Sequence, residues 1–240
     1  MAGAFVVDRL QVTVARSAQE AGRLAALEIA DHLRRLTHTV ETVRVVFAAA
    51  PSQSAMLAVL VDAPGIDWSR VQAHQMDEYL GLSVDAPQCF GNWLRRSLFD
   101  LLPLTFHPLV SADGYLDPAP VDLVCLGIGE NGHLAFNDPP TARFDDDKDL
   151  RVVDLDLTSR VQQVNDGLFA AVQDVPTQAL TLTIPRLMRS HRVVGVACGP
   201  RKTVAVQRTL TGPVDASCPA TALRLHENAS LYTDLAAYPA

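Results

Sequence analysis

A histidine and two adjacent carboxylates occupy the two stretches of this sequence that are best suited to proton transfer. His133 lies in the run 121–140, VDLVCLGIGENGHLAFNDPP, where an apolar segment leads into a glycine-rich turn. Asp77 and Glu78 follow another apolar segment, in the run 74–82, HQMDEYLGL. A histidine with polar neighbours and a carboxylate in an apolar turn are typical acid–base groups of enzymes. Together they favour an enzyme that brings both stretches into one cleft.

The segments around these residues alternate between strand-like and helix-like patterns, which predicts a mostly parallel sheet covered by helices. We expect strands at 43–49, 71–76, 179–184 and 192–198, and helices after Ser17 and at 91–102, 185–189 and 201–210. The predicted architecture is a single three-layer α/β domain over residues 1–240, with helices on both faces of the sheet.

The candidate residues directly follow predicted strands. In open α/β sheets, ligands bind at the carboxyl ends of the strands, so the fold collects side chains that are far apart in sequence. We therefore expect four side chains to converge on one cleft: Ser52, Asp77, His133 and Lys202. Lys202 also stands at the start of a predicted helix, and an ammonium group at a helix N-terminus favours phosphate binding.

Each of these residues also has a purely structural interpretation. Asp77 and Glu78 would then be solvated loop carboxylates, although their apolar neighbours indicate a partly buried turn, where the pKa of a carboxyl group rises. His133 alone is as often structural as functional, and Lys202 alone is normally solvated. The serines of the turn 50–54 would simply cap the helix that follows.

Three glycines, Gly127, Gly129 and Gly132, match the G-x-G-x-x-G fingerprint of dinucleotide-binding proteins. That fingerprint requires a helix that starts near the third glycine and faces a pyrophosphate. Here Pro139 and Pro140 follow shortly after the third glycine and exclude a long helix. We therefore reject nicotinamide and flavin binding.

The composition argues against several other classes. The 240 residues are 48% hydrophobic with a net charge of -7, and basic runs are no longer than pairs, so the electrostatic footprint of a nucleic-acid-binding protein is missing. Asp8 and Arg9 precede any apolar core of signal length, and no stretch reaches the roughly 18 apolar residues of a spanning helix. We expect a cytoplasmic protein with no membrane partner.

The four cysteines are far apart and form no Cys/His cluster of the kind that binds a metal. Cys125 and Cys198 lie inside apolar runs, which favours core packing over nucleophilic catalysis. We expect reduced thiols and no metal site.

Two motifs resemble the glucosamine-6-phosphate deaminase (isomerase) family, which shares its fold with 6-phosphogluconolactonases. They are MDEYLGL at 76–82 and LGIGENGHLAFNDP at 126–139. Lactonases are similar through G-x-G-x-D-G-H, but their motif typically continues as Ala-Ser-Leu-Phe-Pro, whereas 135–138 is Ala-Phe-Asn-Asp here. Weaker matches cover most of the chain, at 164–167, 174–181, 199–202 and 219–226.

The resemblance implies conversion of glucosamine 6-phosphate to fructose 6-phosphate and ammonia, without a metal or an organic cofactor. His133 would open the sugar ring by moving a proton between the ring oxygen and the anomeric hydroxyl. Asp77 would move a proton from C2 to C1, and hydrolysis of the resulting ketimine would release ammonia. Asp138 would orient His133 and balance its charge, with Asn131 beside it.

Four features differ from the family pattern. Asn131 replaces an aspartate of many deaminases, and Asp138 replaces a glutamate that is one methylene longer. The turn 50–54, Ala-Pro-Ser-Gln-Ser, stands in place of a Gly/Thr-rich phosphate loop, and an arginine expected near 165–167 is absent. We assign substrate binding, including the phosphate, to seven residues: Ser52, Gln53, Ser54, Glu78, Gly132, Arg160 and Lys202.

Other functions are compatible with the same residues. A 6-phosphogluconolactonase would share the fold and His133 but would not need Asp77 as a base. A galactosamine-6-phosphate deaminase would differ only in its C4 contacts, which the sequence does not identify, and a non-catalytic sensor would bind the sugar phosphate without turnover. The chain is short after Asp234 compared with hexameric, allosterically regulated members, so we expect a monomer or a small homo-oligomer.

Overall fold

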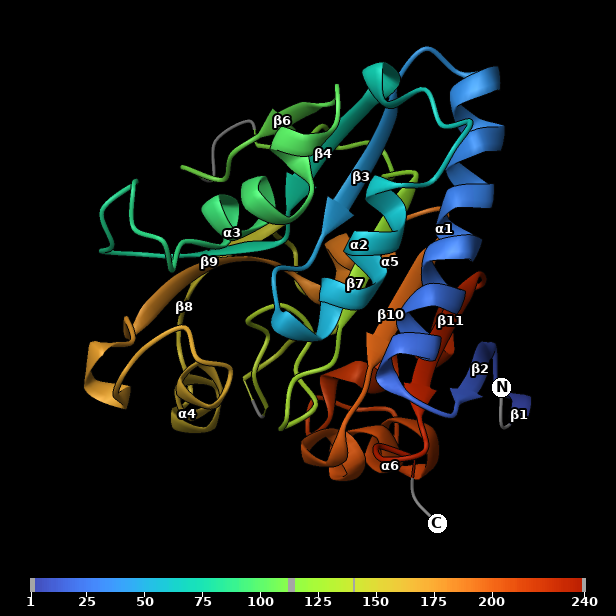
Figure 1. Cartoon of the computed structure of the whole chain (residues 1–240). Helices are drawn as coiled ribbons and strands as arrows, with labels where there is room; N and C mark the ends of the chain where they lie inside the picture. Colours follow the sequence, from blue (N-terminus) through green and yellow to red (C-terminus); the bar gives the residue numbers. More distant parts are fainter. Residues whose placement is uncertain (1–2, 112–114, 140, 239–240) are drawn as a thin grey trace.

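The computed structural model describes residues 3–111, 115–139 and 141–238, and its centre is an eight-stranded sheet (Figure 1). Neighbouring strands are parallel except for β1 and β2, which form an antiparallel hairpin at one edge. The order across the sheet is β1 (Gly3–Val7), β2 (Leu10–Ala15), β11 (Ala229–Asp234), β10 (Val193–Ala197), β7 (Leu123–Gly127), β3 (Val43–Phe47), β4 (Val71–Gln75) and β6 (Thr105–His107).

Helices pack on both faces of this sheet, which confirms the three-layer α/β fold predicted from the sequence. One face carries α1 (Ala18–Thr39), α2 (Ser54–Val61) and α3 (Phe90–Ser97). The other face carries α5 (Ile184–Met188) and α6 (Thr203–Thr211). Short 3-10 helices join the larger elements: η1 (Pro51–Gln53), η2 (Trp68–Arg70), η3 (Phe99–Leu101), η4 (Val172–Asp174), η5 (Pro200–Lys202) and η6 (Pro219–Leu225).

A second sheet has three antiparallel strands, in the order β5 (Asp77–Tyr79), β9 (Gln178–Leu182) and β8 (Leu150–Asp154). Only Met76 separates β5 from β4, so the chain passes directly from the large sheet into the small one. The strand predicted at 179–184 is present as β9, but it belongs to this second sheet and pairs antiparallel with both β5 and β8.

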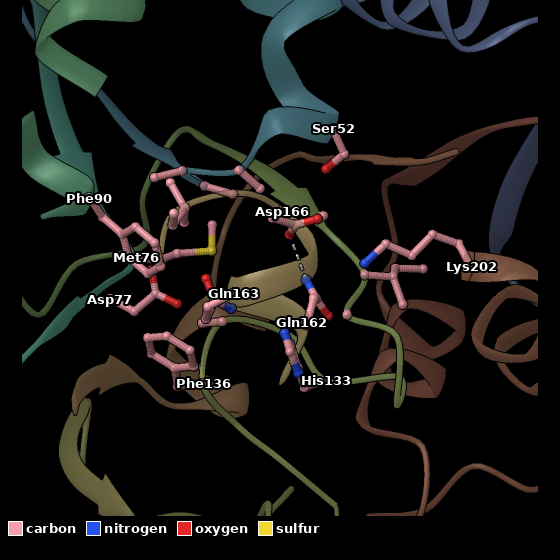
Figure 2. Close-up of a pocket in the computed structure, with 18 residues that line it drawn as sticks. Ser52, Met76, Asp77, Phe90, His133, Phe136, Gln162, Gln163, Asp166 and Lys202 are labelled. Carbon is pink, nitrogen blue, oxygen red and sulfur yellow. Dashed lines mark hydrogen bonds between the residues drawn. The ribbon is translucent and has the colours of Figure 1, made fainter. Parts of the chain in front are cut away.

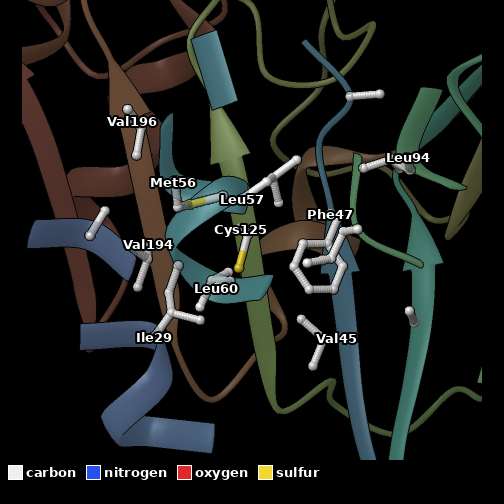
Figure 3. Close-up of a cluster of buried hydrophobic side chains, with 14 of the residues drawn as sticks. Ile29, Val45, Phe47, Met56, Leu57, Leu60, Leu94, Cys125, Val194 and Val196 are labelled. Atoms are coloured by element: carbon white, nitrogen blue, oxygen red, sulfur yellow. The ribbon is translucent and has the colours of Figure 1, made fainter. Parts of the chain in front are cut away.

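The side chains of β3 alternate between two apolar cores, as a strand buried on both faces requires. Val45 and Phe47 face the core under α1 and α2, whereas Val46 belongs to the core on the opposite face. Figure 3 shows Phe47 near Leu60, and Ile29 of α1 reaching the same cluster. Burial on both faces fixes the central strands and the positions of the loops at their carboxyl ends.

The longest helix, α1, begins after Ser17, as the sequence predicts. Ser17 Oγ accepts a hydrogen bond from the backbone N–H of Glu20 (3.2 Å), and the Glu20 carboxylate accepts one from the backbone N–H of Arg16 (2.8 Å). Its apolar face, including Ile29 and Leu33, is fully buried. Within the described ranges, no helix combines the length and the apolar composition needed to cross a bilayer.

Gly22 allows α1 to approach α2 closely. A Cβ atom at this position would lie 2.7 Å from Ala55 Cβ and 2.9 Å from the backbone nitrogen of Met56. The backbone of Met56 cannot move aside as a flexible side chain can, so overpacking here costs the upper part of its usual range, about 2–3 kcal/mol. Replacing a helical glycine gains about 1 kcal/mol, so we expect Gly22→Ala to lower the free energy of unfolding by about 1–2 kcal/mol. Thermal unfolding measures this change.

Gly3→Ala is the control for this prediction, because a Cβ atom at Gly3 would meet nothing within 4 Å. It should unfold at the wild-type temperature. A Gly22→Ala protein as stable as the wild type would contradict the close packing of α1 on α2.

Candidate active site

One pocket is lined by four residues that follow four strands of the large sheet (Figure 2). They are Ser52 after β3, Asp77 after β4, His133 after β7 and Lys202 after β10. These strands are neighbours in the order β10-β7-β3-β4, so their carboxyl ends meet at one edge of the sheet. The side chains that the sequence predicts to converge therefore do lie together. Counted with its open mouth, the pocket has a volume of about 510 Å³.

Asp77 is a buried carboxylate without a partner. Its side chain makes no hydrogen bond or ion pair within the described part of the chain, and the residue is 6% exposed. Burial raises the pKa of Asp77 well above its usual range, and the neighbouring charges of Glu78 and Asp138 raise it further. An unpaired carboxylate with a raised pKa is suited to accept a proton from a bound substrate.

The raised pKa of Asp77 also makes its ionisation unfavourable for folding. The contribution of Asp77 to stability is fully present below its ordinary pKa of 3.8 and is lost as the pH rises through the higher pKa of the folded state. We therefore expect Asp77→Asn to melt at a higher temperature than the wild type at pH 8. Each unit of difference between the folded and unfolded pKa is worth about 1.4 kcal/mol, or roughly 3–5 °C for a domain of this size.

Thermal unfolding of both proteins between pH 4 and pH 8 tests this expectation. The gain in melting temperature should shrink steadily towards pH 4. A variant that melts below the wild type at pH 8 would contradict the burial of an unpaired carboxylate.

His133 is held at one ring nitrogen by polar side chains. Its Nδ1 lies 2.9 Å from Asp138 Oδ1 and 2.8 Å from Ser159 Oγ. Asp138 also accepts hydrogen bonds from the Ser159 hydroxyl and from Asn131 Nδ2 (3.0 Å). Burial raises the pKa of Asp138, but His133 and these hydrogen bonds outweigh it and lower that pKa to about 2. An ionised acceptor at Nδ1 places the imidazole proton there and leaves Nε2 free to exchange protons.

The glycines after β7 allow the imidazole to lie against the backbone. A Cβ atom at Gly129 would lie only 2.3 Å from the ring of His133, and Gly132 adopts a φ of +91°. Asn131 Oδ1 accepts a hydrogen bond from the backbone N–H of His133 (3.0 Å) and fixes the turn. The described residues between β7 and β8 contain no helix, so the turn lacks the helix that a dinucleotide site requires.

Helix α4 (Leu157–Asn165) directs its polar side towards the pocket. Ser159 and Gln163 are buried, whereas Leu157 and Val161 are 62% and 41% exposed. The helix has no apolar stripe that faces the core, so hydrophobic periodicity does not predict it. The signal in the sequence is a polar stripe with i, i+3, i+4 and i+7 spacing: Ser159, Gln162, Gln163 and Asp166.

The glutamines of α4 connect the helix to the rest of the site. Gln162 Oε1 accepts a hydrogen bond from the backbone N–H of Glu130 (2.8 Å), and Gln163 Oε1 accepts one from the Tyr79 hydroxyl (2.7 Å). Figure 2 shows both glutamines between the Asp77 side of the pocket and Lys202. They offer amide groups in the middle of the pocket, where the hydroxyl groups of a sugar can be bound.

Lys202 and Ser52 lie away from Asp77 in the pocket (Figure 2). Lys202 is 8% exposed, and its ammonium group makes no hydrogen bond or ion pair within the described residues. Burial lowers the pKa of Lys202, whereas Asp166 and Glu130 act in the opposite direction. Because a buried charge without a partner is unfavourable, this end of the pocket is suited to an anionic group of a ligand.

The other predicted substrate-binding residues do not line this pocket: Gln53, Ser54, Glu78, Gly132 and Arg160. Gln53 Nε2 donates a hydrogen bond to Ser52 Oγ (3.2 Å) and so helps to position that serine. Glu78 accepts hydrogen bonds from the first two backbone N–H groups of α3 (3.0 and 2.9 Å). Arg160 donates to two backbone carbonyls of the segment after α4 (2.7 and 3.0 Å), and Ser54 is exposed. The hydrogen bonds of Gln53, Glu78 and Arg160 are thus made to neighbouring parts of the protein.

These features define an open α/β protein with an acid–base pocket at the carboxyl ends of its parallel strands. The chain belongs to the glucosamine-6-phosphate isomerase/6-phosphogluconolactonase family, whose model matches residues 16–232. The family resemblance stated for the sequence motifs is thereby confirmed. Both activities in the family's description are enzymatic, so the chain is assigned to a family of enzymes.

The related sequences include several deaminases. The glucosamine-6-phosphate deaminases of Bacillus cytotoxicus and Bacillus thuringiensis are each 35% identical to this chain over 181 residues, which cover 70% of this chain and 67% of each relative.

Similar solved structures come from both branches of the family. A monomeric glucosamine-6-phosphate deaminase has a TM-score of 0.83 and 24% identity, covering 94% of this chain and 98% of that one. A 6-phosphogluconolactonase from Thermotoga maritima has a TM-score of 0.74 and 18% identity, covering 94% of this chain and 99% of that one. At these identities the likeness establishes the fold alone.

Proposed function

We propose that this chain is a deaminase of an amino-sugar phosphate and converts glucosamine 6-phosphate to fructose 6-phosphate and ammonia. The observation that carries the proposal is the unpaired carboxylate of Asp77 in the same pocket as His133. Isomerisation of an amino aldose requires a base for the C2 proton, whereas hydrolysis of a lactone does not. The 35% identity to named deaminases supports the same choice.

The proposed orientation of the substrate follows the charges of the pocket. The phosphate lies at Lys202 and Ser52, where the ammonium group has no protein partner. C1 and C2 lie at Asp77, which occupies another part of the pocket (Figure 2). The glutamines of α4 then lie beside the hydroxyl groups of the sugar.

His133 opens the ring in this proposal. Its Nε2 accepts the proton of the anomeric hydroxyl and delivers that proton to the ring oxygen, so the C1–O5 bond breaks and the aldehyde forms. The ionised Asp138, 2.9 Å from Nδ1, stabilises the imidazolium that appears during the transfer. Ser159 and Asn131 hold Asp138 in place through their own hydrogen bonds.

Asp77 then carries out the isomerisation. Its carboxylate removes the C2 proton while the substrate's own ammonium group gives a proton to the aldehyde oxygen, so that an enolamine forms. Asp77 then returns its proton to C1, and the nitrogen at C2 becomes a ketimine. Water adds to the ketimine carbon, and ammonia leaves to give the ketone of fructose 6-phosphate. This sequence needs one base close to both C1 and C2, and the carboxylate of Asp77 is free of protein contacts that would compete for the proton.

Product analysis by NMR tests the proposal. Purified protein is incubated separately with glucosamine 6-phosphate, galactosamine 6-phosphate and unphosphorylated glucosamine. We expect fructose 6-phosphate and ammonia in equal amounts from the first substrate and no turnover of the unphosphorylated sugar. Faster turnover of the galactosamine compound would change the assigned substrate, and no ammonia from any of the three would refute the deaminase function.

A further inference from the structure

A recess opens beside the lysine end of the pocket and shares Ser52, Asp166 and Lys202 with it. The N-terminal ends of two helical segments meet there, because η1 runs into α2 and η5 runs into α6. Helix N-termini carry partial positive charge, and Lys202 adds a buried ammonium group that lacks a partner among the described residues. The recess is therefore suited to an anion.

Arg201 also lines the recess, where its side chain forms two ion pairs. Its side chain is 56% exposed, with Nε 3.0 Å from Glu130 Oε1 and Nη2 3.4 Å from Asp166 Oδ1. The Glu130 oxygen is buried but receives no well-aligned hydrogen bond. The guanidinium is half exposed, whereas the Glu130 and Asp166 side chains are only 17% and 16% exposed, so the guanidinium leaves these carboxylates only when another anion in the recess replaces them as its partner.

The carboxylates of Asp166 and Glu130 form ion pairs with Arg201, and their charges also act on the pKa of the neighbouring Lys202 without pairing with its ammonium group. A phosphate that enters the recess brings its own negative charge and competes directly with Asp166. The guanidinium of Arg201 can present two parallel N–H groups to a phosphate, whereas the ammonium group of Lys202 acts as a point charge. Arg201 is therefore the stronger partner of a phosphate.

We propose that Arg201 is a specificity-determining residue, which binds the phosphate of the substrate together with Lys202. The inference rests on the proposed function and locates its phosphate in the recess. When the phosphate binds, the guanidinium exchanges Glu130 and Asp166 for phosphate oxygens. Asp166 acts as the competitor that is displaced, so anions with a single charge are held less well than a phosphate dianion.

Calorimetric titration with inorganic phosphate tests this proposal without requiring turnover. Arg201→Gln should weaken phosphate binding about 10- to 100-fold, the range of lost charge-assisted hydrogen bonds. Asp166→Asn should tighten binding, because it removes the competing carboxylate. The control is Arg35→Gln, which alters an exposed arginine paired with Asp31 on α1 and should bind phosphate as the wild type does.

Several outcomes would overturn the role of Arg201. They are phosphate binding by Arg201→Gln within twofold of the wild type, weaker binding by Asp166→Asn, or no measurable binding by the wild type. Circular dichroism confirms that each variant is folded. In steady-state assays with glucosamine 6-phosphate, the KM of Arg201→Gln should rise by a larger factor than its kcat falls.

The failure of this inference is separable from the failure of the proposed function. Phosphate binding that depends on Arg201, in a protein that releases no ammonia, would keep the subsite and refute the deaminase activity. Ammonia release together with phosphate binding that is lost in Lys202→Met but unchanged in Arg201→Gln would keep the activity and refute the subsite role of Arg201.

Discussion

Replacing Asp77 with asparagine is expected to lower kcat for ammonia release from glucosamine 6-phosphate by about 10²- to 10⁴-fold, the range that general-base catalysis supplies. Asparagine has nearly the same shape but cannot take the C2 proton. The Asp77 side chain makes no hydrogen bond or ion pair within the described residues, so the substitution breaks no protein contact. KM should change less than kcat, because the proposed phosphate contact is at Lys202, away from Asp77 in the pocket.

Steady-state kinetics with purified proteins measure this loss. Asp62→Asn introduces the same chemical change at an exposed residue at the end of α2 and should keep the wild-type rate. The wild-type profile of kcat/KM should also fall on its acid side at a pH well above 3.8, because the pKa of Asp77 is raised. An Asp77→Asn protein that keeps more than a tenth of the wild-type rate would remove Asp77 from the mechanism.

His133→Gln is expected to lower kcat about 10²- to 10³-fold. Glutamine keeps a polar side chain near Asp138 but cannot take and return a proton at neutral pH, so opening of the sugar ring loses its catalyst. Because a lactonase of this family would also depend on this histidine, the loss should affect either activity. We therefore measure kcat for His133→Gln and Asp77→Asn side by side. His133 is expected to be needed for both activities, whereas Asp77 is expected to be needed only for deamination.

The coupling of His133 to Asp138 gives a control for this prediction. Asp138 contacts the imidazole at 2.9 Å, and in the proposed mechanism it acts on the reaction only through that ring. Asp138→Asn should therefore reduce kcat in the wild-type background but cause little further loss in His133→Gln. Equal losses in both backgrounds would show that Asp138 works independently of the histidine.

The convergence of the candidate catalytic side chains could be predicted from the sequence because each follows a predicted strand. His133 comes after β7, which is a continuous apolar run, and Asp77 comes after β4, where apolar and polar residues alternate from Val71 to His74. The topological rule for parallel sheets then places their loops at one edge. This reasoning needed no information on which strands are neighbours.

The role of Glu78 could not be predicted in the same way. Its position beside Asp77 suggested a shared pocket, but β5 is a strand, and neighbouring side chains of a strand point to opposite faces. Asp77 therefore faces the pocket, while Glu78 turns to the N-terminus of α3. The segment is only three residues long and follows β4 almost directly, so pattern analysis does not identify it as a strand.

Helix α4 escaped prediction for a different physical reason. The buried side of this helix faces the polar pocket and not the apolar core. Ser159 and Gln162 are therefore buried, while Leu157 remains exposed. The usual amphipathic pattern is thus inverted. Arg160 lies on the same helix but away from the polar stripe, which explains why it bonds to backbone carbonyls instead of lining the pocket.

The most direct test of the central claim compares two reactions in the same preparations. Wild type and Asp77→Asn are assayed for ammonia release from glucosamine 6-phosphate and for hydrolysis of 6-phosphogluconolactone. Our account predicts rapid ammonia release by the wild type, its loss in the variant, and little lactone hydrolysis by either. Lactone hydrolysis by both proteins at similar rates, with no ammonia from the wild type, would contradict the proposed function and the assignment of Asp77 as its base.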